Sequence, residues 1–564
     1  MTSAMTDSTL HPGLVLIAGA LVLPWLRAHL RSAAVLLLPL IVLWLVWQIP
    51  DASWHLRFLD HTLTPLRVDK LSRLFAIIFA LMAFGGGLFA LAQPSRLELP
   101  AAFLYAGSAI GVALAGDLLT LFVFWELMAV GSTLVLWSNG SGRSYRASLR
   151  YIMIHLLGGM ILFAGITGHV AQTGTVEFTR MTLDSPSQWL MLTGFLINAA
   201  APPLSAWLPD AYPEASWSGT VFLSAFTTKA AVYALLRGFP GAELLIWVGI
   251  IMIFYGIIYA LLENDMRRIL AYSIVNQGGF MVAGIGIGSE MALNGAAAQA
   301  FTGVIYVALL LMSAGSVLYM TNRRKCSELG GLFPSRPVTT TCAIVGAAAL
   351  SAFPFTSGFV AKSMISQAAV DGDLLTIWLL LTAASAGAFL HAGIRFPWLV
   401  FFHRDSGLRP TDPPASMRWA MIFFAFLCIA IGVWSEPLYA LLPYAVTFVP
   451  YTWAHVITQL QLLLFSGLAF FLMLPYLRGS PTVTLDTDWL WRRMLPGAAA
   501  VIGRSIKTLQ VTIGGATQRM TSAALVSAIR HYGLESNLAR TWSISGMALW
   551  VLVLLLGYLV LYYL

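Results

Sequence analysis

The sequence predicts an all-α protein that crosses a membrane many times. Of its 564 residues, 59% are hydrophobic and only 10% are charged, and the mean hydropathy is +0.80. A soluble protein of this length needs more polar surface than such a composition provides. The bilayer is therefore the expected solvent of the chain.

Apolar runs long enough to span a bilayer recur along the whole sequence. A helix needs about 20 mostly apolar residues to cross roughly 30 Å of hydrocarbon, and about sixteen runs meet this rule. The predicted spans are 12–30, 33–50, 72–92, 100–115, 117–138, 149–170, 187–206, 218–237, 243–262, 268–288, 294–318, 338–366, 374–400, 417–436, 457–477 and 543–563. We expect the first span to be retained, because it has neither a basic segment before it nor a small-residue cleavage site.

Basic residues gather in alternate loops, as expected when each run crosses the membrane. They follow odd-numbered spans, for example at 143–150 and 323–336, whereas Glu177 and Glu290 lie in opposite loops. The loop at 51–73 is an exception because it mixes both signs. The pattern places both termini outside the cytoplasm and explains the net charge of +8 without a nucleic-acid surface. The lack of an Arg-rich presequence favours the inner membrane of a bacterium.

No part of the sequence predicts a metal or cofactor site. Cys326, Cys342 and Cys428 have no CxxC spacing, so they cannot together build a zinc or iron–sulfur site. The glycines at 284–288 end a predicted span and follow no strand, which argues against a nucleotide loop. We expect a chain without cofactors that is not an enzyme.

Two predicted spans are interrupted by proline. Pro202 and Pro203 break the seventh span, and Pro354, followed by Gly358, breaks the twelfth, 151 residues after Pro203. Proline frees a backbone carbonyl, which inside a bilayer is tolerated only where protein or water binds it. Matching breaks in two halves of a chain are typical of inverted-repeat transporters.

Three charged residues stand out inside predicted spans: Glu126 near mid-depth, Lys229 about eleven residues into its span, and Lys362 after the second break. A charge near the centre of a span costs about 2.5–3.5 kcal/mol even on the mildest scale, so each is expected to face protein or water. Burial and an opposite charge alter proton affinity in opposite directions, which lets such groups pass protons to one another. The alternative is a static ion pair between Glu126 and Lys229. Asp210 and Glu214 are expected to be structural or to gate the mouth of the first break.

Further polar residues extend this predicted relay. His155 and His391 lie in spans, and a neutral imidazole both donates and accepts a proton. Taken singly, either histidine is more often a hydrogen-bonding group of the core. Gln277 lies opposite Glu126 when the sequence is shifted by the 151 residues between the breaks.

The stretch at 484–540 is too polar to cross the membrane and too apolar for an ordinary loop. Basic residues alternate there with Val, Ile, Leu, Ala and Gly. This composition predicts an amphipathic lateral helix in the membrane interface. The alternative is a strap that binds neighbouring subunits.

Several motifs resemble the antiporter-like subunits of respiratory complex I and of Mrp-type multisubunit cation/proton antiporters. The matching segments are VDKLSRLF (68–75), GDLLTLFVFWELM (116–128), PLSAWLPDAYPEA (203–215), the helix of Lys229, NDMRRILAYSIVNQGGF (264–280), ELGGLF (328–333), FPFTSGFVAKS (353–363) and PPASM (413–417). The tail resembles the lateral helix and last span of the long members, and DTDWLWRR (486–493) is most similar to Mrp-type relatives.

This resemblance implies a fold and a set of site residues. The fold would be a fourteen-helix core with two inverted five-helix repeats and broken helices 7 and 12. Glu126 would match the essential glutamate of the fifth helix, Lys229 the central lysine, and Lys362 the exit lysine. The implied regions are 1–99 (helices 1–3), 100–237 and 243–400 (the repeats), 417–477 (C-terminal core helices), 484–540 (lateral helix) and 543–564 (final span).

The sequence departs from the family pattern at two places. Asn198 stands where the family usually has the lysine partner of the fifth-helix glutamate, and Gly303 and Val307 stand where it often has a histidine and a lysine. Asparagine can hydrogen-bond in a relay but cannot switch a neighbour by changing charge. Either Lys229 becomes the partner of Glu126, or the relay is degraded and the subunit is partly structural.

Three functions follow from these observations. The leading hypothesis is a proton-conducting subunit of an Mrp-type antiporter, with protons, Na⁺ or another cation, and other membrane subunits as partners. The second is a proton-pumping subunit of a redox complex, such as NADH:quinone oxidoreductase or a membrane hydrogenase. The third is a coupling or scaffold subunit of an inorganic-carbon uptake complex, which the departures favour.

Overall fold

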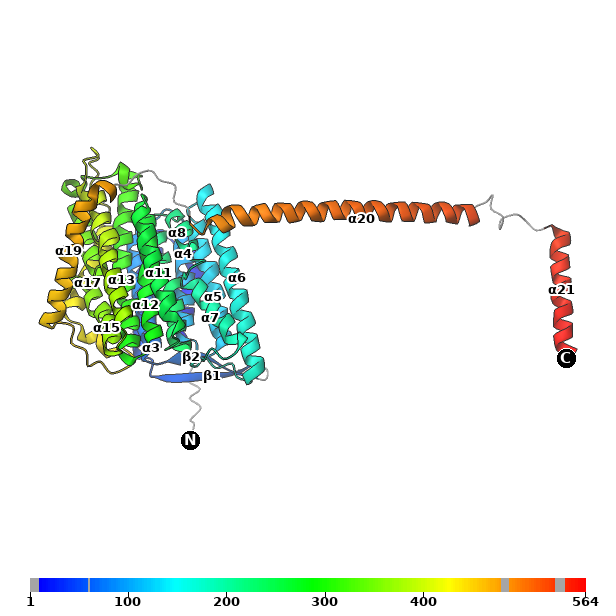
Figure 1. The fold of residues 1–564 in the computed structure, drawn as a ribbon, viewed down its shortest axis with the longest axis horizontal. Helices are drawn as coiled ribbons and strands as arrows, with labels where there is room; N and C mark the ends of the chain where they lie inside the picture. The colour runs from blue at the N-terminus through cyan, green and yellow to red at the C-terminus, as the bar shows by residue number, and fades with distance from the viewer. Residues whose placement is uncertain (1–9, 59–60, 478–485, 533–542, 564) are drawn as a thin grey trace, which may run out of the picture. The chain divides into compact units, whose positions relative to one another are not determined.

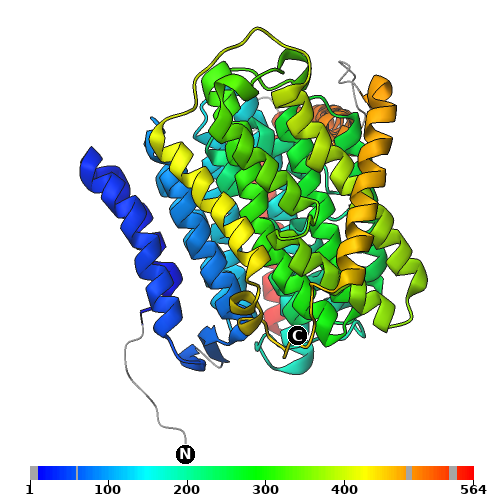
Figure 2. The same ribbon diagram turned by 90° about the vertical axis from the view of Figure 1, so that its left-hand side faces the viewer.

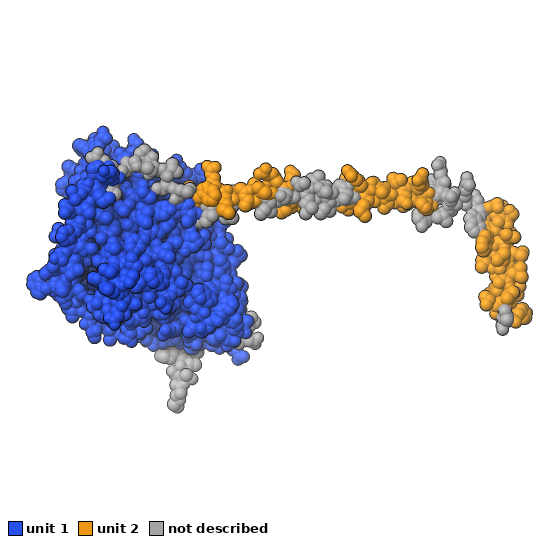
Figure 3. All heavy atoms as spheres, viewed as in Figure 1, with its two compact units in different colours: residues 1–488 blue, residues 489–564 orange. Residues whose placement is uncertain are grey.

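The protein is predominantly helical. A computed structural model describes residues 10–58, 61–477, 486–532 and 543–563. The chain divides into two compact units, residues 1–488 and 489–564 (Figure 3).

The first unit is a helix bundle. Its α-helices are α1 (Pro12–Val22), α2 (Ala28–Gln48), α3 (Lys70–Phe89), α4 (Glu98–Leu114), α5 (Leu118–Trp137), α6 (Gly142–Thr173), α7 (Pro186–Asn198), α8 (Trp207–Ala211), α9 (Gly219–Leu223), α10 (Thr227–Gly238), α11 (Leu244–Leu262), α12 (Met266–Ile287), α13 (Glu290–Thr321), α14 (Pro337–Leu350), α15 (Ser357–Asp371), α16 (Leu375–Ala388), α17 (Ala415–Val433), α18 (Glu436–Ala440) and α19 (Trp453–Leu477). Figure 2 shows the blue N-terminal helices at one edge of the bundle and the orange α19 at the opposite edge.

Twelve helical segments of the described chain are long and apolar enough to cross a membrane. They lie at twelve of the sixteen predicted spans, which supports a multi-pass membrane protein. The other four predicted spans, 12–30, 100–115, 187–206 and 338–366, hold shorter helices. Near the prolines, α7 ends at Asn198 and α14 ends at Leu350, because a proline cannot continue a helical hydrogen-bond ladder.

A β-hairpin departs from the predicted all-α fold. β1 (Ala52–Phe58) pairs antiparallel with β2 (His61–Val68) in the loop that mixes charges of both signs. In β2, buried and less buried residues alternate, and Thr64, Leu66 and Val68 lie inward. This period of two is the signal of a strand, and the charges of the loop obscured it in the sequence. Figure 1 shows the hairpin at the end of the bundle opposite to α8.

Two helix pairs of the bundle repeat at a spacing of 148 residues. α5 and α12 begin after the N-caps Asp117 and Asp265, and these two residues also form β-bridges, to Glu177 and Lys325. α6 and α13 both have 32 residues, begin after a serine N-cap and end at a left-handed residue. The corresponding caps are Ser141 and Gly174 for α6, and Ser289 and Asn322 for α13.

This spacing differs from the 151 residues between the prolines. At 148 residues Glu126 lies opposite Ile274, whereas a shift of 151 residues places it opposite Gln277, so the pairing of Glu126 with Gln277 stays a prediction. The ends of α7 and α14, which precede the two breaks, are 152 residues apart. The difference arises because the connection from α13 to α14 is longer than that from α6 to α7.

α11 and α12 approach each other through glycine. A Cβ atom built on Gly279 would lie 2.5 Å from the carbonyl oxygen of Gly249 and 2.8 Å from the amide nitrogen of Ile253. Small residues of this kind let helix backbones pack closely in membranes. The apolar window of α12 is entirely buried, so this contact holds in place the helix that carries Gln277.

In its described residues the second unit contains two α-helices, α20 (Leu495–Tyr532) and α21 (Ile544–Tyr563), and a short π-helix (Leu490–Met494) before α20. α20 corresponds to the helix expected over 484–540, and its basic residues Arg504 and Lys507 are exposed. Residues 484–485 and 533–540 of that stretch lie outside the described residues. Whether α20 lies in the membrane interface or against a partner remains a prediction. α21 is one of the twelve candidate spans.

The packing of α11 on α12 gives a stability prediction. We expect Gly279→Ala to lower the free energy of unfolding by about 1–3 kcal/mol, because the added methyl overlaps backbone atoms of α11. Gly278→Ala is the matched control, since its nearest atom is Cε of Met252 at 3.3 Å, the end of a flexible side chain. Both changes add the same helix propensity. Equal melting temperatures in detergent would contradict this account of the helix pair.

Candidate functional site

Glu126 lies on α5 and is half-buried. Its carboxylate packs against α6 at Gly159, where an added Cβ would collide with Oε1. Oε1 is itself buried and accepts no hydrogen bond from the described residues. The carboxylate is therefore positioned by its packing against Gly159, and not by an ion pair with another described residue.

Lys229 is buried near the start of α10, and it forms no ion pair with Glu126 or with any other described carboxylate within 4 Å. The static pair with Glu126 is therefore not present. Nζ instead donates to the carbonyl oxygen of Ser224 at 3.1 Å and to Oγ1 of Thr228 at 3.3 Å. Ser224 lies between α9 and α10, where the interrupted helix leaves carbonyls free.

Further polar side chains lie on the face of α6 that packs against Glu126 at Gly159. His155 and Tyr151 precede Gly159 by one and two turns of α6, so all three lie on one face of the helix. Nδ1 of His155 lies 2.9 Å from Oδ1 of Asn198, and its Nε2 is buried without a partner among the described residues. The rings of His155 and Tyr151 have centroids 4.1 Å apart.

The tyrosine continues this row of polar groups toward the lysine. The hydroxyl of Tyr151 donates to Oγ of Ser132 at 2.9 Å and lies 3.5 Å from Oγ1 of Thr227. Thr227 also lies 2.6 Å from the hydroxyl of Tyr105 and begins the helix that carries Lys229. Hydroxyl and imidazole groups both donate and accept, so the row has the chemistry of a proton relay.

Lys362 is buried in α15, directly after the second break. Nζ donates to the carbonyl oxygen of Leu350 at 2.6 Å, and Leu350 is the last residue of α14. The ammonium also lies 4.8 Å from the centroid of the Phe280 ring, a cation–π contact. Gly358 permits this arrangement, because an added Cβ would collide with the carbonyl oxygen of Ala349. The break therefore supplies the acceptor that binds the lysine.

Gln277 belongs to a polar cluster between α12 and α13. Its Oε1 accepts from Nε2 of Gln299 at 3.0 Å and from the hydroxyl of Tyr306 at 3.0 Å, and its Nε2 donates to Asn276 at 2.7 Å. Gln299 and Tyr306 were missed from the sequence. The signal was available, since both are polar residues in a long apolar run. Tyr306 also fills the space at Gly303, where its hydroxyl would lie 3.5 Å from an added Cβ.

His391 lies in a π-helical stretch (Phe389–Arg395) that continues α16. Its Nδ1 lies 2.9 Å from the carbonyl oxygen of Gly387, one turn earlier. Its Nε2 is buried and has no hydrogen-bond partner in the described chain. Among the predicted relay residues, His155 therefore lies within hydrogen-bond distance of Asn198, and Gln277 accepts a hydrogen bond from Gln299. His391 instead contacts a backbone carbonyl of its own helix.

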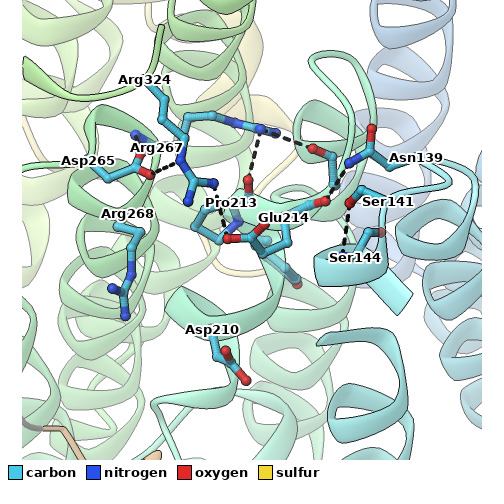
Figure 4. A network of polar contacts seen from close by, with 12 residues as sticks. Asn139, Ser141, Ser144, Asp210, Pro213, Glu214, Asp265, Arg267, Arg268 and Arg324 are labelled. Atoms are coloured by element: carbon cyan, nitrogen blue, oxygen red, sulfur yellow. Dashed lines mark hydrogen bonds and ion pairs between the residues drawn. The ribbon is translucent and has the colours of Figure 1, made fainter. Parts of the chain in front are cut away.

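Arg267 organises the loop that follows the first break. It donates to the carbonyl oxygen of Pro213 at 2.9 Å (Figure 4). It also donates to the carbonyl oxygens of Ala215 at 3.0 Å and Ser216 at 2.7 Å, and to the Thr220 hydroxyl. The guanidinium is buried and satisfies carbonyls that a loop would otherwise leave unpaired.

The acidic residues near this loop are in ion pairs. Asp210 pairs with Arg150 at 2.7 Å, and Glu214 pairs with Arg324 at 3.1 Å. Arg324 also pairs at 3.0 Å with Asp265 (Figure 4). Burial raises the pKa of Asp265 above its usual value, against the opposing effect of Arg324. These contacts support the structural role expected for Asp210 and Glu214.

Glu98 is a buried carboxylate that was missed from the sequence. It begins α4 and accepts hydrogen bonds from Gln93 at 2.9 Å, from Ser138 at 3.2 Å and from Ser218. It was missed because it lies just outside the predicted span 100–115, where a charged residue is expected to belong to a loop. Three donors satisfy it, so it holds the ends of α4, α5 and α9 together.

The described residues contain no group of three His, Cys, Asp or Glu side chains that could hold a metal ion. The site consists of proton donors and acceptors placed in a row. Such groups support proton transfer along side chains and water, and they offer no nucleophile with an adjacent base.

Comparisons with known proteins identify the family. Residues 115–387 match the family model described as NADH:quinone oxidoreductase/Mrp antiporter, TM. NADH-quinone oxidoreductase subunit M of Pseudomonas aeruginosa is 30% identical over 365 residues, which are 59% of this chain and 70% of that protein. The chain belongs to this family, and the resemblance found in its motifs is confirmed.

Antiporter components also match. A probable K⁺/H⁺ antiporter protein of Rhizobium meliloti is 29% identical over 58% of this chain, but the match spans only 35% of that longer protein. A component of the Na⁺/H⁺ antiporter of Alkalihalophilus pseudofirmus is 29% identical over 47% of this chain and 58% of its own length. The relatives are thus membrane subunits of antiporters and of redox complexes.

Two solved structures share the fold. A chain of the Mrp complex from Dietzia sp. superposes with a TM-score of 0.67 over 77% of this chain and 95% of its own, at 22% identity. A chain of the archaeal membrane-bound sulfane sulfur reductase superposes with a TM-score of 0.70 over 98% of this chain and 99% of its own, also at 22% identity.

The loop contacts of Arg267 give a second stability prediction. We expect Arg267→Ala to lower the free energy of unfolding by about 3 kcal/mol or more, because it leaves buried carbonyls unpaired. Arg268→Ala is the neighbouring control, since Arg268 is partly exposed and its one described ion pair, with Glu263, is 3.2 Å long. The comparison requires thermal unfolding of both variants in the same detergent. A melting temperature of Arg267→Ala no lower than that of Arg268→Ala would refute the role.

Proposed function

We propose that this chain is a proton-conducting membrane subunit of an Mrp-type antiporter complex, which exchanges protons for Na⁺ or another cation. The observation that carries the proposal is the way both buried lysines are bound. Lys229 and Lys362 each donate to a backbone carbonyl at a helix interruption, at 3.1 and 2.6 Å, and neither pairs with a described carboxylate.

This mode of binding suits a proton carrier. A lysine paired with a carboxylate is held in its charged form by the partner, and losing the proton leaves an unpaired buried charge. A carbonyl accepts a hydrogen bond from an ammonium and from a neutral amine alike. Lys229 and Lys362 can therefore release and regain a proton without losing their contact.

The proposed path begins at Glu126. A proton taken up there passes by way of His155, Tyr151 and Thr227 to Lys229. From Lys229 it continues through water and the Gln277 cluster to Lys362. Charge on each group alters the proton affinity of the next, which couples the steps.

The proposal includes the finer fold implied by the family: sixteen spans, two inverted repeats at 100–237 and 243–400, and broken helices 7 and 12. Two observations support it. The helix caps of α5 and α6 recur 148 residues later in α12 and α13. Ala200 and Ala352, each two residues after a broken helix ends, both have a positive φ, of 62° and 56°.

The second candidate is a proton-pumping subunit of a redox complex. It is favoured by the match to NADH-quinone oxidoreductase subunit M and by the fold shared with the sulfane sulfur reductase chain. Both candidates place the chain among other membrane subunits and use the same path. A purified complex with flavin and iron–sulfur absorbance would select the second.

Proton flux in a reconstituted complex tests the proposal. We expect Glu126→Gln and Lys362→Ala each to reduce cation-coupled proton flux roughly tenfold or more, because each removes a titrating group from the path. Glu177→Gln is the control for the glutamate, since Glu177 is exposed on a loop. Unchanged coupling in both test variants would exclude proton conduction through this chain and leave the scaffold role.

A further inference from the structure

A pocket lies beside Lys362, between α15, α16 and α19. It offers about 210 Å³ of space to water, which is enough for several molecules. Its polar lining includes Lys362, Ser363, Ser366 and Gln367 of α15, Ser385 of α16 and His455 of α19. Burial of a charged group beside a hydrophilic pocket is typical of an ion pathway.

The pocket runs toward one end of the bundle. Lys362, Ser366 and Val370 are spaced four apart along α15, as are Ser363 and Gln367, so the lining follows one face of the helix to its end at Asp371. His455 lies in the first turn of α19, at the same end. The positive-inside pattern assigns this end to the outside of the cytoplasm.

His455 is held in a defined orientation by two hydrogen bonds in series. Nε2 of Gln367 donates to Oδ1 of Asp371 at 2.7 Å, and a carboxylate can only accept. Oε1 of Gln367 therefore faces Nε2 of His455, at 3.0 Å. Since an amide oxygen also only accepts, Nε2 of the imidazole carries the hydrogen, and Nδ1 is the nitrogen with a free lone pair. Nδ1 has no partner among the described residues.

The matching place in the first half holds an ion pair. At the 152-residue spacing of the breaks, Lys362 corresponds to Asp210, which pairs with Arg150. Lys362 has no such partner in the described chain and opens onto the pocket instead. The two halves therefore differ at this position, because Asp210 is in an ion pair whereas Lys362 lies beside a polar pocket.

From these observations we infer that His455 transfers protons between Lys362 and the aqueous phase outside the cytoplasm. This inference rests on the proposed function. The Lys362 ammonium gives a proton through pocket water to Nδ1 of His455, and the amine keeps its bond to the Leu350 carbonyl. The imidazolium then loses the Nε2 proton at the Gln367 side to water near Asp371. A shift of the remaining proton, or rotation of the ring, restores the starting tautomer.

Flux measurements on the whole reconstituted complex test the role of His455. We expect His455→Ala to reduce proton flux roughly tenfold or more, and millimolar imidazole to restore part of it, because a free imidazole fits the pocket and replaces the relay group. His29→Ala is the control, since His29 is exposed on α2. Rescue by imidazole separates a relay from a structural role, which added imidazole would not repair.

Thiol labelling tests the pocket without reference to flux. Ser366→Cys is expected to react with a charged, membrane-impermeant methanethiosulfonate added from outside. Ala361→Cys is expected not to react, because Ala361 lies on the same helix and is fully buried. The three native cysteines are buried, so the wild-type background is expected to be low.

The outcomes separate the inference from the proposed function. If Lys362→Ala abolishes flux while His455→Ala keeps wild-type flux, the function stands and the inference is overturned. Loss of flux in His455→Ala without imidazole rescue, or an unreactive Ser366→Cys, also overturns it. If Glu126→Gln and Lys362→Ala both retain wild-type flux, the proposed function itself fails.

Discussion

A backbone carbonyl that loses its helical partner inside a membrane has to find another donor, and this constraint organises the charged interior of the protein. Lys362 binds the carbonyl at the end of α14, and Lys229 binds the carbonyl between α9 and α10. Arg267 binds three carbonyls of the loop after the first break. The cations thus supply hydrogen-bond donors to the free carbonyls, and the carbonyls supply acceptors to the buried cations, so that each stabilises the other in a bilayer.

The need of free carbonyls for a donor is met by two kinds of cation, arginine with a structural role and lysine that can take part in transport. Arginine stays charged, so Arg267 fixes its loop permanently. Lysine can lose its proton, and a carbonyl partner does not oppose that loss as a carboxylate would. Glu126, which packs against Gly159 with Oε1 unpaired in the described chain, is the one half-buried carboxylate on the same row. The acidic residues near the first break, by contrast, are neutralised by arginine.

The sequence predicts well the features that cost free energy in a membrane, such as buried charges and helix ends. It predicts poorly the features that depend on contacts between distant residues. The positions of the charges and of most spans follow from apolar run length, and the helix ends at Asn198 and Leu350 follow from the prolines nearby. The hairpin was missed because its alternation is short and its charges suggest a loop. The partners of Lys229 could not be foreseen, because a backbone carbonyl leaves no trace in the residue types. The spacing of 148 residues between similar helix caps was also missed, because the prolines alone give 151 residues.

The central claim is that Lys229 works by releasing its proton and not merely by carrying charge. The most direct measurement is proton flux in the reconstituted complex with Lys229→Arg, compared with Lys229→Met. Arginine keeps the charge and the hydrogen-bond donors but does not give up a proton at physiological pH. The account predicts that both variants lose proton flux while the complex still assembles. Flux at the wild-type rate in Lys229→Arg would contradict it, because charge alone would then be sufficient.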